Sequence, residues 1–211
     1  GLPAVRTIVV RGREVSVCDN GVPVEQLDCE DPLAYIAEYQ TRFHAPAVDE
    51  LPRFCGGLVG YFGYDTVRYV EPRLRASTPP DPIGTPDIYL MQVDKFVVFD
   101  NLRGELLLVK YIDASDEALL DDARRELGAL AARLQAPAPA FPLHSTGAPL
   151  EEVDFHSEFG SDAFKQAVER IKRYIVDGDV MQVVLAQRMS VELNLPPLNV
   201  YRALRHLNPS P

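Results

Sequence analysis

Three prolines within seven residues, from Ala136 to Pro142, interrupt this chain of 211 residues. Each proline fixes its own φ, lacks a backbone N–H and holds the residue before it in an extended conformation. Such a segment cannot continue a helix or a central strand, and here it runs directly into a polar stretch. We therefore interpret residues 136–152 as a linker that joins one structural unit over residues 1–135 to another over residues 153–211.

Strand and helix patterns alternate irregularly in the first unit. Two short β-rich runs, Thr7–Val10 and Glu14–Val17, flank Arg11-Gly12-Arg13 and predict a hairpin. The elements expected after it are a helix from Asp31-Pro32 to Pro46, a strand Gly56–Gly63, a short helix or turn Asp65–Tyr69, a Pro-rich loop Thr78–Pro86, one long strand Ile88–Phe99, its partner Glu105–Ile112, and a helix from Ser115 or Asp116 to Leu134.

The second unit has a clearer pattern. Ser161 is expected to cap a helix with one apolar stripe that ends at Gly178. A strand with alternating apolar and polar residues is expected from Gln182 to Leu193, and a helix from Leu198 to Leu207. Helices and strands mix without regular βαβ alternation, so the sequence predicts an α+β fold.

The net charge of the chain limits the classes of molecule that it can bind. With 31 Asp and Glu against 21 Lys and Arg, the net charge of −10 argues against nucleic acid as a partner. No apolar run approaches the roughly 20 residues of a membrane span, and Gly1–Val5 lacks the pattern of a signal peptide. Cys18, Cys29 and Cys55 have no zinc-site spacing, so we expect reduced thiols in a cytoplasmic protein.

Three segments could carry chemistry, and each also has a purely structural interpretation. The glycines of Gly56–Asp65 fit neither the dinucleotide fingerprint nor a phosphate loop, which favours a strand with close backbone approach. The polar face of Gly178–Arg188 could be solvent-exposed or could line a pocket for an anionic substrate. Asn208–Pro211 could end a helix or form a rigid backbone shelf beside a small ligand.

These segments, in this order, resemble the chorismate-utilising enzymes, and within them the anthranilate synthase component I family. The motifs that carry the resemblance are Gly56–Asp65 continued by Thr66–Glu71, then Gly178–Arg188, then Tyr201–Leu204 leading to Asn208–Pro211. The resemblance covers nearly the whole chain and identifies it as the N-terminal portion of such an enzyme. It implies a layered β-sandwich-type core with surrounding helices, incomplete here, in which residues 1–135 form a regulatory-type domain and residues 153–211 begin the chorismate-binding domain.

Three positions help to choose the subfamily. Isochorismate and salicylate synthases carry a lysine that activates water where this chain has Gln182. A carboxamide cannot act as a general base near neutral pH, so the resemblance favours ammonia as the nucleophile. Aminodeoxychorismate synthases usually carry Asn at the position of Val184 and Ala at that of Ser210, so both residues favour anthranilate.

The resemblance implies that ammonia adds to chorismate with loss of water, and that pyruvate is then eliminated to give anthranilate. It also implies Mg²⁺ as cofactor, a glutamine amidotransferase subunit (component II) as ammonia source, and feedback inhibition by L-tryptophan. Two alternatives stay open: aminodeoxychorismate synthase component I, and a non-catalytic regulatory fragment.

Few of the family's functional residues can be assigned within these 211 residues. Gln182 is expected to line the substrate pocket. Asn208, Pro209, Ser210 and Pro211 match the tryptophan-binding motif, with Pro211 expected to contact the inhibitor directly. The Mg²⁺ ligands, the chorismate-binding residues and an N-terminal strand that completes the inhibitor pocket are expected elsewhere. The 211-residue segment alone is therefore expected to be inactive.

Overall fold

The computed structural model describes residues 2–45, 51, 54, 56–113, 115–137, 151, 154–193 and 195–209. The chain divides into two compact units, Gly1–Pro137 and Ala138–Pro211. Residues 138–150, 152 and 153 lie outside the described residues, so the linker over 136–152 and the domain boundaries based on it stay predictions. The two units are described separately below.

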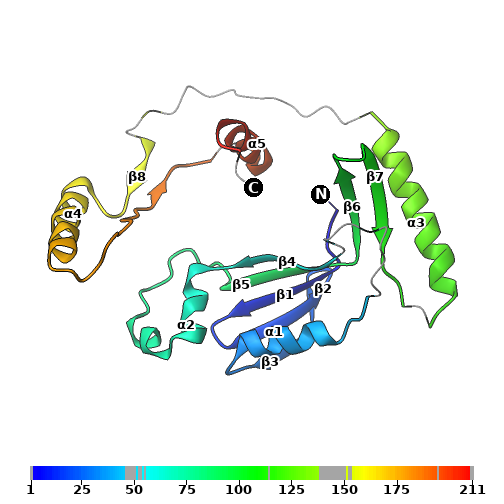
Figure 1. Ribbon diagram of the computed structural model, residues 1–211, viewed down its shortest axis with the longest axis horizontal. Coiled ribbons are helices and arrows are strands. Elements are labelled where there is room, and N and C mark those ends of the chain that lie inside the picture. The colour runs from blue at the N-terminus through cyan, green and yellow to red at the C-terminus, as the bar shows by residue number, and fades with distance from the viewer. Residues whose placement is uncertain are drawn as a thin grey trace. The chain divides into compact units, whose positions relative to one another are not determined.

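A five-stranded antiparallel sheet with the order β3-β2-β1-β5-β4 forms the centre of the first unit (Figure 1). Its strands are β1 (Arg6–Arg11), β2 (Glu14–Asp19), β3 (Val22–Asp28), β4 (Gly57–Phe62) and β5 (Ile88–Val93). β1 and β2 form the predicted hairpin, in which Arg11 pairs with Glu14 across the turn. β3 was not predicted, whereas β4 confirms the predicted glycine-containing strand.

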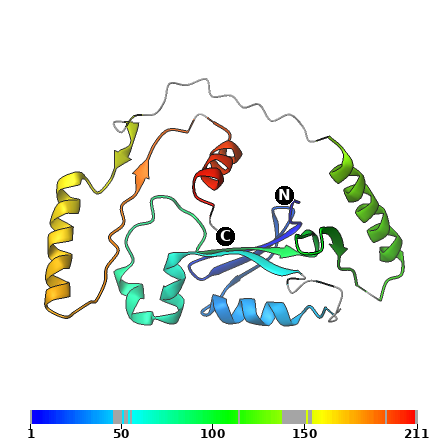
Figure 2. The same ribbon diagram turned by 45° about the horizontal axis from the view of Figure 1, so that its top comes forward.

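The core of the first unit lies between this sheet and helix α1 (Pro32–Thr41), which runs along one face (Figure 2). Successive strand residues point to opposite faces, so the alternate aliphatic residues of three strands meet on the side of α1. These are Ile8, Val10, Val15, Val17, Ile88 and Leu90, all at most 2% exposed, and α1 adds Tyr35, Ile36 and Tyr39. Burial of each such aliphatic side chain contributes about 1.5–3 kcal/mol.

Helix α1 begins where the sequence predicts. The side chain of Asp31 accepts a hydrogen bond from the backbone N–H of Ala34 at 3.0 Å and thereby caps the helix. Pro32 occupies the first helical position, where a missing N–H costs no helical hydrogen bond.

A second, two-stranded sheet pairs β6 (Lys95–Asp100) with β7 (Glu105–Lys110). The prediction of one long strand over Ile88–Phe99 is wrong, because the chain leaves the first sheet at Asp94 and starts the second at Lys95. Asp94 has a low preference for strands, and its carbonyl accepts the N–H of Tyr111 at 2.7 Å instead of joining a regular ladder. A turn over residues 101–104 joins β6 to β7.

Helix α3 (Ala118–Gln135) packs against β7 and confirms the predicted helix. The carboxylate of Glu126 on α3 forms ion pairs with Nζ of Lys110 at 2.6 Å and with Nζ of Lys95 at 2.8 Å. The hydrogen bond from Lys110, with that from Lys95 second, lowers the pKa of the Glu126 carboxyl to about 2.

The described residues of the second unit form two helices, α4 (Ser161–Val176) and α5 (Pro197–Leu207), and one short strand pair, β8 (His156–Ser157) with β9 (Met189–Ser190). The cap predicted at Ser161 is wrong: Gly160 is the N-cap residue, and Ser161 is already helical. Gly178 ends α4 as predicted. Its φ of 83° lets the N–H of Asp179 turn back to the carbonyl of Tyr174 at 2.9 Å.

The strand predicted from Gln182 to Leu193 is wrong over most of its length. Only Met189–Ser190 is a strand, and residues 182–188 have no regular secondary structure. A strand needs a hydrogen-bonding neighbour, and the neighbour described here, His156–Ser157, is two residues long. None of the described residues of the second unit is buried, so the apolar alternation faces no buried core within the described part of the unit.

The mixture of antiparallel sheets and helices confirms the predicted α+β class. Among the helices that the structure describes, none is both long enough and apolar enough to cross a membrane.

Candidate functional site

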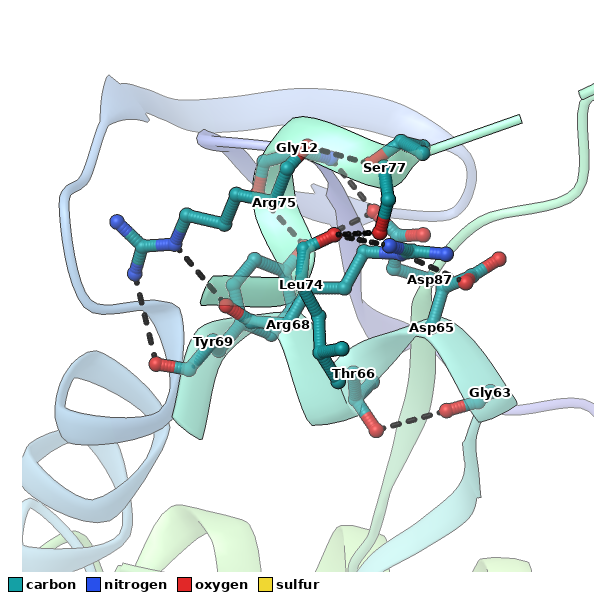
Figure 3. Close-up of polar contacts among 11 residues, drawn as sticks. Gly12, Gly63, Asp65, Thr66, Arg68, Tyr69, Leu74, Arg75, Ser77 and Asp87 are labelled. Atoms are coloured by element: carbon teal, nitrogen blue, oxygen red, sulfur yellow. Dashed lines mark hydrogen bonds and ion pairs between the residues drawn. The ribbon is translucent and has the colours of Figure 1, made fainter. Parts of the chain in front are cut away.

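The segment Gly56–Glu71, which carries the first family motif, leads from β4 into three short helical elements. These are η1 (Tyr64–Thr66), α2 (Val67–Val70) and, directly after the motif, η2 (Pro72–Ser77). A polar network holds them together and fastens them to the first hairpin (Figure 3).

Tyr69 and Asp87 form the part of the network that reaches the hairpin. The Tyr69 hydroxyl lies 2.9 Å from Oδ2 of Asp87 and 2.7 Å from the carbonyl oxygen of Gly12, and the backbone N–H of Gly12 donates to Asp87 Oδ2 at 2.6 Å. Partial burial raises the pKa of Tyr69, and the hydrogen bond to Asp87 raises it further. The tyrosine therefore remains a neutral hydrogen-bond donor, which anchors α2.

Arg68 forms the second part of the network. Its Nε donates to Oδ1 of Asp65 at 2.8 Å, and its Nη1 donates to the carbonyl of Leu74 (Figure 3). The carbonyl of Arg68 in turn accepts Nε of Arg75 at 3.0 Å. These contacts use the guanidinium of Arg68 to hold η1, α2 and η2 in one compact turn, so its role in this structure is positional.

The glycines of the motif have the structural role that the sequence favoured. A Cβ on Gly60 would lie 1.9 Å from the carbonyl oxygen of Tyr89, and a Cβ on Gly63 would lie 2.9 Å from that of Asp87. The backbone of β4 therefore approaches β5 too closely for any side chain at Gly60.

A cavity of about 190 Å³ opens at one end of the sheet, lined by Val5, Arg6, Asp19, Gln92 and Asp94. Arg6 donates to both carboxylate oxygens of Asp19, at 2.6 and 2.8 Å, and this pairing lowers the pKa of Asp19. Ligand pockets commonly measure about 300–1,000 Å³, so this cavity is small for a substrate site. None of the predicted site residues lines it.

Gln182 is exposed and lies in the irregular stretch after α4. Two contacts attach the end of this stretch to the residues before α4: Arg188 forms an ion pair with Glu158, and Ser157 Oγ donates to Gln187 Oε1 at 3.0 Å. Gln182 does not line the cavity described above, and its place in a substrate pocket stays a prediction.

Asn208 is the C-cap residue of α5, and its backbone N–H donates to the carbonyl of Leu204 at 2.8 Å. Asn208 and Pro209 are both exposed, which agrees with the helix-ending interpretation and leaves a ligand role untested. Ser210 and Pro211 lie outside the described residues. No hydrogen bond joins Gln182 to Asn208 in the part of the chain that the structure describes.

Sequence reasoning missed the Tyr69–Asp87–Gly12 network. The neighbouring ion pair does have a local signal in the sequence, because Asp65 and Arg68 are three residues apart within one helical turn. For metals, no three His, Cys, Asp or Glu side chains gather into a possible ion site within the described ranges. The described residues therefore form no site that fits a magnesium ion, and we derive no catalytic step through one.

Comparison with known proteins gives the family. The family described as chorismate binding enzyme matches residues 8–211 and so extends across both units. Anthranilate synthase component 1 of Pseudomonas putida is 45% identical over 212 residues, which cover 100% of this chain and 43% of that protein. The protein of the same name from Neisseria meningitidis serogroup B (strain ATCC BAA-335 / MC58) is 46% identical over 214 residues, covering 100% and 43%.

A solved structure agrees with this result. The crystal structure of anthranilate synthase component I from Streptococcus pneumoniae TIGR4 superposes with a TM-score of 0.74 at 28% identity, over 99% of this chain and 45% of that chain. The chain thus spans less than half of the length of these relatives. Because the family match takes in all but the first seven residues, the chain belongs to the chorismate binding enzyme family.

Proposed function

We propose that this chain is part of an anthranilate synthase component 1, which converts chorismate and ammonia to anthranilate and pyruvate. The observation that carries the proposal is the identity of 45–46% to relatives of that name along 100% of the chain. Since the chain spans 43% of those relatives, the activity is proposed for the whole protein, and the 211-residue segment alone is proposed to be inactive.

Gln182 is proposed to contact the substrate in the whole protein. Its carboxamide can donate and accept hydrogen bonds but cannot take a proton from water near neutral pH. An amine nucleophile brings its own lone pair and needs no such base, which supports ammonia over water as the attacking group. In the segment alone Gln182 is exposed, so this role requires residues from outside the described part to enclose it.

The proposal includes four further features of the whole protein. A glutamine amidotransferase subunit (component II) supplies ammonia, and Mg²⁺ is the cofactor, with its ligands outside the described residues. L-tryptophan inhibits through a site that includes Asn208, Pro209, Ser210 and Pro211. The protein acts in the cytoplasm, which is in keeping with a biosynthetic role and with cysteines that show no zinc spacing.

The direct test incubates the whole protein with chorismate, an ammonium salt and Mg²⁺ and follows anthranilate by its fluorescence. We expect anthranilate and pyruvate in equal amounts. Aminodeoxychorismate without anthranilate would refute the proposal in favour of aminodeoxychorismate synthase component I. Binding of L-tryptophan without turnover of chorismate would instead favour the regulatory alternative.

The inhibitor site is tested separately by calorimetry. L-tryptophan is expected to bind the whole protein, with L-phenylalanine as the control ligand. It is not expected to bind the 211-residue segment, because the pocket is proposed to need an N-terminal strand from outside it. Equal binding by both proteins would show that the proposed composition of the pocket is wrong.

A further inference from the structure

The two edge strands of the five-stranded sheet differ sharply in their protection against pairing. β3 contains Pro23, carries the charges of Glu25 and Asp28, and faces a β-bulge between Val17 and Cys18 of β2. Proline, charge and bulges are the devices by which proteins keep an edge strand from pairing further. The β3 edge is therefore built to end the sheet.

β4, at the opposite edge, has none of these devices. Its sequence, Gly-Leu-Val-Gly-Tyr-Phe, contains no proline and no charge, and its pairing with β5 shows no bulge. Val59, Tyr61 and Phe62 are 37%, 43% and 54% exposed. An edge that is regular, uncharged and apolar favours the addition of another strand.

The backbone of β4 offers the groups that such a strand needs. The N–H of Gly63, directly after β4, donates to the carbonyl of Asp87 at 2.7 Å, so the N–H of Gly63 points toward the β5 side. Hydrogen-bonding direction alternates along an antiparallel strand, which turns the N–H and C=O groups of Leu58, Gly60 and Phe62 away from β5. Within the described part of the chain these groups have no backbone partner.

We infer that β4 is a strand-acceptor edge, and that its occupant is an extended, largely apolar segment of the same polypeptide. The chain spans 43% of relatives that it matches along its whole length, so these relatives contain more than enough further chain to supply one strand. The inference rests on the proposed function in one respect only, namely that this chain is part of such a longer protein.

Hydrogen exchange measured on the whole protein tests the inference with an internal control. The alternation that directs Leu58, Gly60 and Phe62 outward on β4 directs Gln26 and Asp28 outward on β3, because the N–H of Cys29 donates to the carbonyl of Arg13 at the end of that ladder. We expect the outward amides of β4 to exchange at least about tenfold more slowly than those of β3. Equal, fast exchange on both edges would overturn the inference.

The identity of the occupant is tested by diluting the protein. A strand from the same polypeptide gives protection that does not change with protein concentration. Protection of β4 that disappears on dilution would assign the edge to a second copy of the chain and overturn the inference.

A matched pair of variants provides the second measurement. Phe62→Lys places a charge on the β4 edge, and Val24→Lys places one on the β3 edge at nearly equal exposure, 54% against 57%. We expect Phe62→Lys to lower the Tm of the whole protein and Val24→Lys to leave it unchanged, whereas equal shifts would contradict a covered β4.

Neither the hydrogen-exchange measurement nor the Tm measurement depends on turnover of chorismate. Protected amides without anthranilate formation would refute only the proposed function, and anthranilate formation with unprotected amides would refute only this inference.

Discussion

The hydroxyl of Tyr69 lies 2.9 Å from the carboxylate of Asp87, and this contact joins the segment that carries the first family motif to the strand that lies beside it. The same carboxylate accepts the N–H of Gly12 in the first hairpin turn. One side chain therefore connects three segments that are far apart in the sequence.

Tyr69→Phe is expected to destabilise the protein by about 1–2 kcal/mol, because it removes a partly buried hydrogen bond to a charged group. Chemical denaturation followed by circular dichroism measures the change. Tyr64→Phe is the matched control, since Tyr64 is 92% exposed. Equal losses in the two variants would show that the contact with Asp87 contributes nothing to stability.

Gly60→Ala is expected to destabilise the protein by about 3 kcal/mol, because the new methyl group would lie 1.9 Å from the carbonyl oxygen of Tyr89. This oxygen belongs to the backbone, so the clash cannot be relieved by rotation of a side chain. Gly128→Ala should have the opposite sign. Gly128 lies inside α3 with nothing within 4 Å of its Cβ position, so alanine should add about 0.5–1 kcal/mol. Thermal unfolding of both variants checks the prediction, and a stable Gly60→Ala protein would contradict it.

The lowered pKa of Glu126 predicts that the stability of the protein decreases at acid pH. Its pKa is lowered from an ordinary 4.5 to about 2, so its pairing with Lys110 and Lys95 stabilises the fold fully above pH 4.5. That contribution, about 1 kcal/mol for a partly exposed group, is lost as the pH falls from 4.5 to 2. The stability difference between wild type and Glu126→Gln should therefore shrink over this range. Gln135→Ala at the end of the same helix is the control, because neither side chain titrates and its difference from wild type should stay constant.

Gln182→Leu tests the proposed substrate contact in the whole protein. Loss of a hydrogen bond to the bound substrate should lower kcat/KM for chorismate by about tenfold, with ammonium as nitrogen source. The neighbouring variant Met181→Leu is the control and should have little effect, because leucine keeps an apolar side chain of similar volume at a position that is 98% exposed in this structure. Unchanged kcat/KM in Gln182→Leu would remove this residue from the proposed site.

The sequence allowed prediction of those elements whose signals are local. The hairpin around Gly12, the start of α1 at Asp31 and the end of α4 at Gly178 each depend on residues within one turn of the boundary. Strand β3 was missed because Pro23 and its polar neighbours give little strand preference, and it forms through pairing with β2. The strand predicted over residues 182–193 failed for the converse reason, since its pattern is suitable but its described partner is two residues long.

The candidate site shows the same limit. Tyr69 is 57 residues from Gly12 and 18 from Asp87, so no spacing in the sequence indicates that their polar groups meet. The tryptophan and substrate residues came from family resemblance alone. Gln182, Asn208 and Pro209 are exposed residues in the structure, and the pockets that they are proposed to line stay untested.

The break at Asp94 has a mechanical consequence. β5 and β6 are one covalent run divided by this single residue, and α3 is fastened to the β6–β7 hairpin by Glu126. The hairpin and α3 are therefore joined to the first sheet through Asp94, whose carbonyl accepts the N–H of Tyr111 at 2.7 Å. A substitution that disturbs Asp94 would act on β5 and β6 together, because one strand ends and the other begins beside it.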